Sequence, residues 1–496
     1  MVTIYATGVA AIIAFVAVLF ADFLPMIAGS YSDQRFLLAI LVGIIVSGAL
    51  CLILGRRHLP NFKAAHLVLG LLFASGFPVL AFPFLDQPYV FVEPGLYAFY
   101  FAAIILGGQA LVVRGITETY LVLILSTAGA ACFVYGAMSV NVYLFALVGR
   151  QADLSGLIPW GFVNIRYWSH IATWLLPILP LAALVGPLAQ YRLWRTIVAI
   201  SAGLWWWILL MSTSRGSILG ITLGVVFAAS FLGRPAWPWL RQFCVYLAVG
   251  VAFWLLLSVL IPSLVFGETE LRTISSTSSG RLPLFKEAWA MSLQNFPFGM
   301  GPQSWLTHEL LTQSYIDSKK FGHPHNMYLM WAAEYGWLLI FALTALGIQF
   351  TRLLRLRRQT MVSEPKRDDM ALLAAFLASV TGALVHAGVS AVFIAPGSML
   401  VGLWILIGFC GQVIPTSAYG PNETPSGVGE RSTSGVIWVA LVLTIWGFWF
   451  NEVLRYHSDM TEDKVLYSEQ LRQPIMPRFW FHGNFPRILG QSSTDG

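Results

Sequence analysis

Two histidines stand close together in a polar stretch that ends where a new apolar segment begins. His323 and His325 flank Pro324, and Asn326 opens the apolar segment. The proline holds the preceding chain extended, which fixes His325 at the edge of that segment. A neutral imidazole there can take a proton from an attacking hydroxyl. The alternatives are a capping or packing role and a metal site, but no Asp-x-Asp motif or third close ligand accompanies the pair.

Two arginines add the chemistry of anion binding. Arg215 lies in a tight turn between apolar segments, and Arg281 follows a serine-rich stretch and precedes an amphipathic run over residues 282–293. A serine N-cap would place Arg281 at a helix N-terminus, where free amides favour an anion. Hydroxyls near Arg215 also suit phosphate oxygens; they belong to Ser212, Thr213, Ser214 and Ser217. We predict a diphosphate pocket, against the plainer interpretations of a snorkelling helix-end arginine and a solvated surface arginine.

Weaker candidates lie at the ends of other apolar segments. Arg166 and His386 could bind substrate or serve only as helix-end anchors. Glu334 lies within the apolar segment that Asn326 opens, and a carboxylate at that depth implies a buried partner. We therefore expect His325, Arg281 and Arg215 to be catalytic. The expected substrate-binding residues are Arg166, His323, Asn326, Glu334 and His386.

The composition is that of a membrane protein. Hydrophobic residues make up 57% of the chain, charged residues only 10%, and the mean hydropathy is +0.73. Soluble domains carry about 25% charged residues, so a soluble protein is excluded. The net charge of +6 comes from basic residues in connections between apolar segments, which favours membrane orientation over nucleic-acid binding. The 4 cysteines lie in or beside apolar segments and indicate neither a disulfide framework nor a zinc site.

Apolar segments of about 20 residues are long enough to cross a bilayer. The chain is predicted to be an all-α polytopic integral membrane protein with about thirteen transmembrane helices. One long loop, residues 266–325, is expected to carry amphipathic helices. The expected spans are 5–26, 36–54, 66–85, 95–113, 119–140, 168–190, 196–212, 216–232, 243–265, 326–349, 370–391, 398–414 and 435–450.

The distribution of basic residues sets the expected orientation. With a cytoplasmic N-terminus, about fifteen lysines and arginines fall on the cytoplasmic side and about four in short external connections. The loop over 266–325 and a tail over 451–496 are then external. The cytoplasmic set is Arg56, Arg57, Lys63, Arg114, Arg192, Arg195, Arg234, Arg241, Arg352, Arg355, Arg357, Arg358, Lys366, Arg367 and Arg431; the external set is Arg35, Arg150, Arg166 and Arg215.

These residues together resemble a known family. Arg281 is followed by Trp289, by the turn Pro297-Phe298-Gly299-Met300-Gly301, by His323-Pro324-His325-Asn326 with Leu329, and by Glu334-Tyr335-Gly336. The turn Ser214-Arg215-Gly216 fits the same pattern. This order resembles the O-antigen ligase and O-antigen polymerase superfamily. The resemblance covers residues 160–410, and its most specific part runs from Arg281 to Gly336.

The resemblance implies a multi-helix glycosyltransferase acting on undecaprenyl-diphosphate-linked glycans, at the periplasmic face of the bacterial inner membrane. The family's diphosphate-binding arginines carry over to Arg215 and Arg281, and its essential histidine to His325; Arg166 matches less closely. The resemblance also implies no nucleotide sugar, metal or cofactor. An inverting transfer is expected because a single direct displacement would invert the anomeric centre. Residues 1–450 would form the transmembrane glycosyltransferase domain. The tail from residue 451 is not part of the shared pattern.

The acceptor is left open by the sequence. Another lipid-linked repeat would make the protein a polymerase, lipid A-core a ligase, and a pilin serine or threonine a protein O-oligosaccharyltransferase. A transporter or flippase of lipid-linked glycans would have as many spans, but usually shows an internal repeat and broken or charged helices at the bilayer midplane. A receptor or assembly protein would leave the arginines and histidines unexplained. Besides donor and acceptor, the expected partners are membrane lipids, and nucleic acid is not among them.

Overall fold

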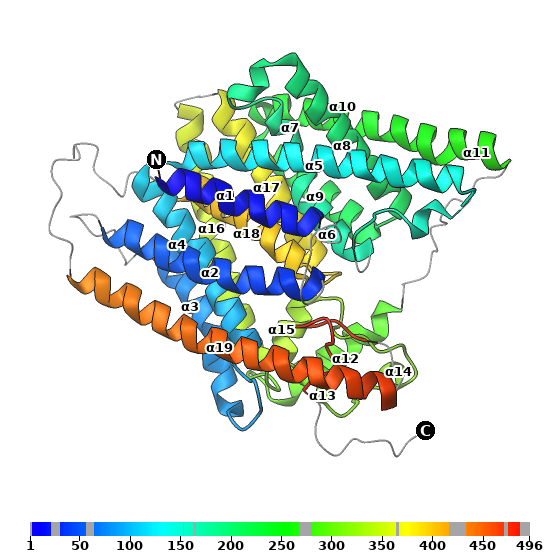
Figure 1. Cartoon of the computed structure of the whole chain (residues 1–496). Coiled ribbons are helices and arrows are strands. Elements are labelled where there is room, and N and C mark those ends of the chain that lie inside the picture. Colours follow the sequence, from blue (N-terminus) through cyan, green and yellow to red (C-terminus); the bar gives the residue numbers. More distant parts are fainter. Residues whose placement is uncertain are drawn as a thin grey trace.

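The protein is built from helices that pack into a bundle (Figure 1). A computed structural model describes residues 2–20, 30–55, 64–151, 153–162, 165–267, 280–363, 367–415, 433–470 and 475–486, and these contain no strand. The all-α polytopic fold class is thus confirmed. The helices are α1 (Val2–Leu19), α2 (Ser30–Leu54), α3 (Ala65–Ala81), α4 (Val92–Arg114), α5 (Thr117–Val148), α6 (Ile165–Leu175), α7 (Leu179–Ala182), α8 (Arg192–Ser212), α9 (Arg215–Leu232), α10 (Trp237–Trp254), α11 (Ile261–Phe266), α12 (Arg281–Gln294), α13 (Ser304–Thr307), α14 (Gln313–Ile316), α15 (Met327–Tyr335), α16 (Trp337–Ser363), α17 (Arg367–Ala387), α18 (Pro396–Val413) and α19 (Thr433–Gln470).

The helices are less continuous than the sequence predicted. Among the described residues, 11 helices are long and apolar enough to cross a membrane, against about thirteen expected spans. The apolar part of α1, Gly8–Leu19, is shorter than the others. The span expected over 168–190 is divided into α6, α7 and a 3-10 turn at Pro187–Gln190. Pro177, Pro180 and Pro187 interrupt it because proline has no amide hydrogen to donate.

The span expected over 326–349 is also divided. The helix α15 ends at Tyr335, the following Gly336 has a φ of 88° that lies outside the helical region, and α16 begins at Trp337. The Phe296–Gly301 turn fills the break. The Trp337 amide donates to the Pro297 carbonyl at 2.8 Å, and the Met300 amide donates to the Ala333 carbonyl at 2.8 Å. The turn and the two half-helices are therefore one hydrogen-bonded unit.

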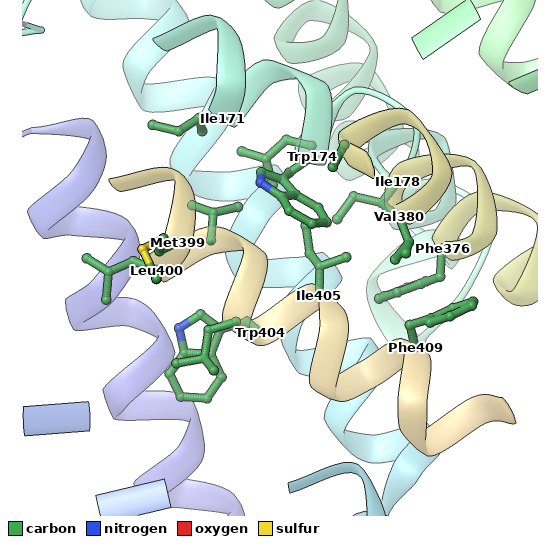
Figure 2. Close-up of a cluster of buried hydrophobic side chains, with 14 of the residues drawn as sticks. Ile171, Trp174, Ile178, Phe376, Val380, Met399, Leu400, Trp404, Ile405 and Phe409 are labelled. Atoms are coloured by element: carbon green, nitrogen blue, oxygen red, sulfur yellow. The ribbon is translucent and has the colours of Figure 1, made fainter. Parts of the chain in front are cut away.

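The centre of the bundle is α18, where 94% of the most apolar stretch is buried. Figure 2 shows its side chains interleaved with those of α6 and α17. Hydrogen bonds also join the helices in this core, since the Ser379 hydroxyl donates to the Trp174 carbonyl at 2.6 Å and the Trp174 indole donates to Ser398 at 3.2 Å. The interleaved residues include Ile171, Trp174, Ile178, Phe376, Val380, Met399, Leu400, Trp404, Ile405 and Phe409.

The helices α9 and α17 are in backbone contact through glycines. A Cβ added at Gly224 would lie 2.2 Å from the Ala378 carbonyl oxygen, and one at Gly220 would lie 2.5 Å from the Gly382 oxygen. No side chain fits between the two helices at these points. This contact sets the positions of Arg215, the first residue of α9, and of His386 in the last turn of α17.

A small cap formed by α12–α15 lies at one end of the bundle (Figure 1). The amphipathic helix expected over 282–293 is α12, although the residue before it is Gly280 with a φ of 67° and no side-chain cap. The expected capping serines, Ser275–Ser279, lie outside the described residues. The cap has its own apolar core, formed by Leu284, Ala288, Met291, Trp305, Tyr315 and Ala333.

The C-terminal part of the chain returns to this same end. The helix α19 continues without interruption through residue 450, where the sequence placed a domain boundary, and ends at Gln470. Residues 475–486 then pack back against the bundle, with Phe479 and Trp480 buried. The expected boundary at 450 therefore falls inside a helix, and the tail is packed together with the cap.

Candidate active site

Three arginines and a histidine come together between the cap and the bundle. Arg166 is the second residue of α6, Arg215 opens α9 and Arg281 opens α12, while His325 precedes Asn326, the N-cap residue of α15. A guanidinium nitrogen of Arg166, Nη1, lies 3.4 Å from Nε2 of His325. The amino ends of helices carry partial positive charge and free amides, so three such ends add to the positive potential of the arginines.

The electrostatics of this cluster are those of an anion site. Burial and then the neighbouring charges of Arg166 and Arg215 lower the pKa of the Arg281 guanidinium. Arg166 and Arg215 are exposed and Arg281 is half-buried. No ion pair between Arg281 and a carboxylate is found among the described residues. Like charges this close repel one another, and a bound anion with two or more negative charges would relieve that repulsion.

His325 is held in an uncommon conformation at the edge of the cluster. Its φ is 57°, in the left-handed region, and its amide donates to Nδ1 of His323 at 3.1 Å. The two rings lie 4.3 Å apart, edge to face. An arginine can only donate hydrogen bonds, so the contact with Arg166 leaves the lone pair of His325 on Nε2 and the proton on Nδ1. In the described part of the chain, that Nδ1 is buried and has no hydrogen-bond partner.

Both loop histidines are electrically neutral in this environment. Burial, followed by the charges of Arg166 and Arg281, lowers the pKa of His325 to about 3. Burial also lowers the pKa of His323 well below its ordinary value, with the charges of His325 and Arg478 acting in the same direction. A neutral imidazole with a lone pair facing an arginine cluster can accept a proton from a hydroxyl once an anion offsets the surrounding positive charge.

Two of the predicted substrate-binding residues have clear structural contacts. The Asn326 side chain accepts a hydrogen bond from the Leu329 amide at 3.0 Å and so caps α15. Glu334 is fully buried and has the buried partner that the sequence required, since Arg478 donates to it at 2.5 Å. The Trp305 amide donates to its other oxygen at 3.3 Å. These contacts bind the cap and tail together.

His386 lies deeper, below the arginines. Its Nδ1 is 2.9 Å from the Thr173 hydroxyl, and its ring lies 4.9 Å from that of His170. His170 was not selected from the sequence, although it follows Arg166 by four residues and so shares its helix face. Nε2 of His170 lies 2.7 Å from the Ser390 hydroxyl. The floor of the arginine cluster is thus formed by neutral polar side chains.

Arg478 and Glu93 were also missed. Glu93 lies in α4 and Arg478 in the tail, and neither belongs to a recognisable motif. The described residues contain no group of three or more histidine, cysteine or acidic side chains placed to hold a metal ion. Metal independence of the reaction stays a prediction.

The comparisons with known proteins agree with the resemblance. Residues 197–344 match the family model described as O-antigen ligase. This segment is therefore similar to the O-antigen ligase domain. This segment contains Arg215, Arg281, His325 and Glu334, whereas Arg166 and His386 lie outside it. No curated protein matches the chain. The resemblance to the O-antigen ligase and polymerase superfamily is confirmed over this segment. The 11 membrane-length apolar helices among the described residues are those of a multi-pass membrane protein, and the family match suggests glycosyl transfer.

Proposed function

We propose that this O-antigen ligase-type protein transfers a glycan from an undecaprenyl-diphosphate donor to an acceptor hydroxyl. The reaction would occur at the periplasmic face of the bacterial inner membrane. The observation that carries the proposal is the meeting of three arginines, each within the first two residues of a helix, beside a neutral histidine. Arginine recognises phosphate oxygens through two parallel hydrogen bonds, and a diphosphate can engage more than one arginine.

Each residue has a role in the proposed transfer. Arg215 and Arg281 hold the diphosphate, with Arg166 beside them. His325 accepts the proton of the acceptor hydroxyl as its oxygen attacks the anomeric carbon. The bond from that carbon to the diphosphate oxygen breaks, and undecaprenyl diphosphate leaves with the electron pair. The arginines stabilise the charge that develops on it, and one direct displacement inverts the anomeric centre.

Donor binding and base strength are linked in this proposal. The arginines and burial keep His325 neutral in the empty site, so it is then a weak base. A bound diphosphate would offset the arginine charges and raise the affinity of His325 for a proton. His325 would therefore become an effective base only when the donor is present. Its imidazole would stay unprotonated until the donor binds.

A panel of three acceptors identifies the acceptor class. A second lipid-linked repeat, lipid A-core and a pilin serine or threonine are the three candidates. A transporter or flippase is the alternative from another class; it would move the lipid-linked glycan without breaking its bond to diphosphate. Product analysis with each acceptor separates these outcomes, and the same protein can be used throughout.

The central experiment is the His325→Ala variant. Purified protein is incubated with undecaprenyl-diphosphate glycan and each acceptor, with EDTA in a parallel set. General-base assistance is worth about 10²- to 10⁴-fold in rate, so we expect only a trace of product and accumulation of donor. His323→Ala is the comparison variant and should be milder, because the His323 ring contacts only the backbone amide of His325 in this hydrogen bond and does not replace the proposed base. Near-normal turnover by His325→Ala would remove the base from the mechanism.

The orientation is a second testable part of the proposal. The cap and the end of α19 lie on one side of the bundle, and we expect that side to be periplasmic from the charge asymmetry. Five of the basic residues that carry this asymmetry, Arg56, Arg57, Lys63, Lys366 and Arg431, lie outside the described residues. Cysteines placed at Lys319 and at Leu466, an exposed position beside Tyr467, should react with an impermeant label in intact spheroplasts. Labelling only after permeabilisation would reverse the orientation.

A further inference from the structure

The tail over residues 475–486 is fixed firmly beside the candidate active site. Its backbone is held by α2, because Arg35 donates to the Phe479 carbonyl at 2.9 Å and the Tyr31 hydroxyl donates to the Arg478 carbonyl at 2.6 Å. The Trp480 ring packs 4.8 Å from that of Phe36. Arg35 and Arg478 are each only 1% exposed. The segment is therefore a buried part of the fold.

Arg478 connects three separate parts of the chain. Its guanidinium makes two parallel hydrogen bonds to Glu93 of α4, with Nη2 at 2.9 Å from Oε1 and Nε at 3.1 Å from Oε2. The same Nη2 donates to Glu334 of α15 at 2.5 Å. The remaining nitrogen, Nη1, donates to the Gly322 carbonyl at 3.2 Å. All of these bonds are buried, where hydrogen bonds between charged groups are strongest.

The hydrogen bond to Gly322 connects Arg478 with the loop that holds His325. Gly322 precedes His323, whose Nδ1 accepts the amide hydrogen of His325. The loop and tail backbones also touch here, because a Cβ added at Gly322 would lie 2.8 Å from the Pro477 carbonyl oxygen. His325 has a left-handed backbone conformation that most residues avoid, so the surrounding contacts must hold it. Arg478 provides one of those contacts through Gly322, whereas Arg166 contacts the His325 ring directly.

We propose that Arg478 is a positioning residue for His325, and that residues 475–486 are an integral part of the transfer site. Arg478 acts through the Gly322 carbonyl and the His323 ring and does not itself touch the reacting atoms. This inference rests on the proposed function in one respect, that His325 is the base. The anchoring of the loop by the tail is independent of it and can be measured separately.

Two measurements on the full chain test the proposal. The first is hydrogen–deuterium exchange over residues 321–327, which reports how firmly the loop is held. The second is steady-state transfer, with kcat and the donor KM determined separately. The test variants are Arg478→Lys, which keeps the charge but cannot make the same set of bonds, and Gly322→Ala, which disturbs the contact while keeping every charge. The control is Arg455→Lys, since Arg455 is an exposed arginine of α19 paired only at 3.6 Å with Glu452.

We expect both test variants to exchange faster over 321–327 and to lose about 10²-fold in kcat, because small misplacements of a catalytic group have effects of that size. The donor KM should stay unchanged, since the arginine cluster is intact. A merely destabilised protein would lose donor-binding sites in proportion to its rate, so kcat is expressed per donor-binding site. Glu93→Gln keeps an acceptor oxygen for Arg478 and should retain most of the wild-type rate. Arg455→Lys should match the wild type in both measurements.

Unchanged exchange in both test variants would overturn the proposal whatever the activity. Faster exchange with normal kcat would also overturn it, because His325 would then not depend on the anchor. If the wild-type protein transfers glycan to no acceptor, the proposed function fails, and the exchange measurement alone decides whether Arg478 anchors the loop. If His325→Ala is inactive while the Arg478 variants are normal, the proposed function stands and only the positioning role is lost.

Discussion

Arg478 and the cluster of Arg166, Arg215 and Arg281 lie at the same end of this protein and differ in burial and in their neighbouring charges. Arg478 is 1% exposed and is enclosed by two carboxylates, Glu93 and Glu334. Arg166 and Arg215 are exposed, and with Arg281 they form a group of like charges at helix N-termini. Arg478 is balanced within the fold and holds segments together. The cluster of Arg166, Arg215 and Arg281 lies at helix N-termini and is less buried, so burial separates a structural arginine from those that could contact a bound anion.

The largest effect expected from this comparison is on stability. Arg478→Ala would leave two carboxylates buried without their cation, and breaking a buried ion pair in this way costs about 3–5 kcal/mol. Arg281→Ala should leave thermal unfolding unchanged or slightly improved, because it removes repulsion from Arg166 and Arg215. Thermal unfolding of both variants in the same detergent measures the difference. Equal destabilisation by the two substitutions would break the comparison.

A smaller effect is expected on donor binding. Arg215→Ala and Arg281→Ala each remove a charge-assisted contact to phosphate, worth about 1.5–3 kcal/mol, while the protein stays folded. Lysine at either position should restore only part of the affinity, because a point charge cannot make two parallel hydrogen bonds. Binding of undecaprenyl diphosphate to each variant is the measurement. Full affinity in both alanine variants would remove the diphosphate pocket.

The smallest effect concerns pH. With the pKa of His325 lowered to about 3, the free enzyme keeps this histidine neutral well below the ordinary value of 6.5. The value of kcat/KM, which reports the free enzyme, should therefore show no fall around pH 6.5 as the pH decreases to 5. Arg166→Gln removes the nearest positive charge and should move the acid limb upward toward 6.5. A wild-type acid limb already at 6.5 would show that the cluster does not act on His325.

The features of the site that depend on residues close together in the sequence could be predicted from the sequence. Arg281 was expected at the start of an amphipathic helix and is the first residue of α12. The interruption of two spans was also visible in principle, because Pro177, Pro180 and Gly336 are strong helix breakers. Hydropathy alone overlooked it, since the apolar composition continues across each break. The length of an apolar segment predicts that it crosses the membrane. It does not predict that the segment forms one unbroken helix.

Contacts between distant segments could not be read in this way. Arg478 lies 144 residues from Glu334 and 385 from Glu93, and Arg166 lies 159 from His325. The sequence showed that Glu334 needed a buried partner but gave no means of choosing it among the arginines of the chain. The tail was set apart because it matched no family pattern. Its role depends on packing, which a local pattern does not describe.

The glycine contact between α9 and α17 gives the candidate pocket one wall that cannot adjust. With backbone against backbone at Gly220 and Gly224, the two helices have no side chains between them that could be repacked or exchanged for smaller ones. Arg215 and His386 therefore keep a fixed spacing. Arg281 is carried by the cap instead, on a helix whose apolar core is small and separate. Changes in the size of the glycan that such a protein accepts should arise from substitutions in the cap, while the α9–α17 side stays constant.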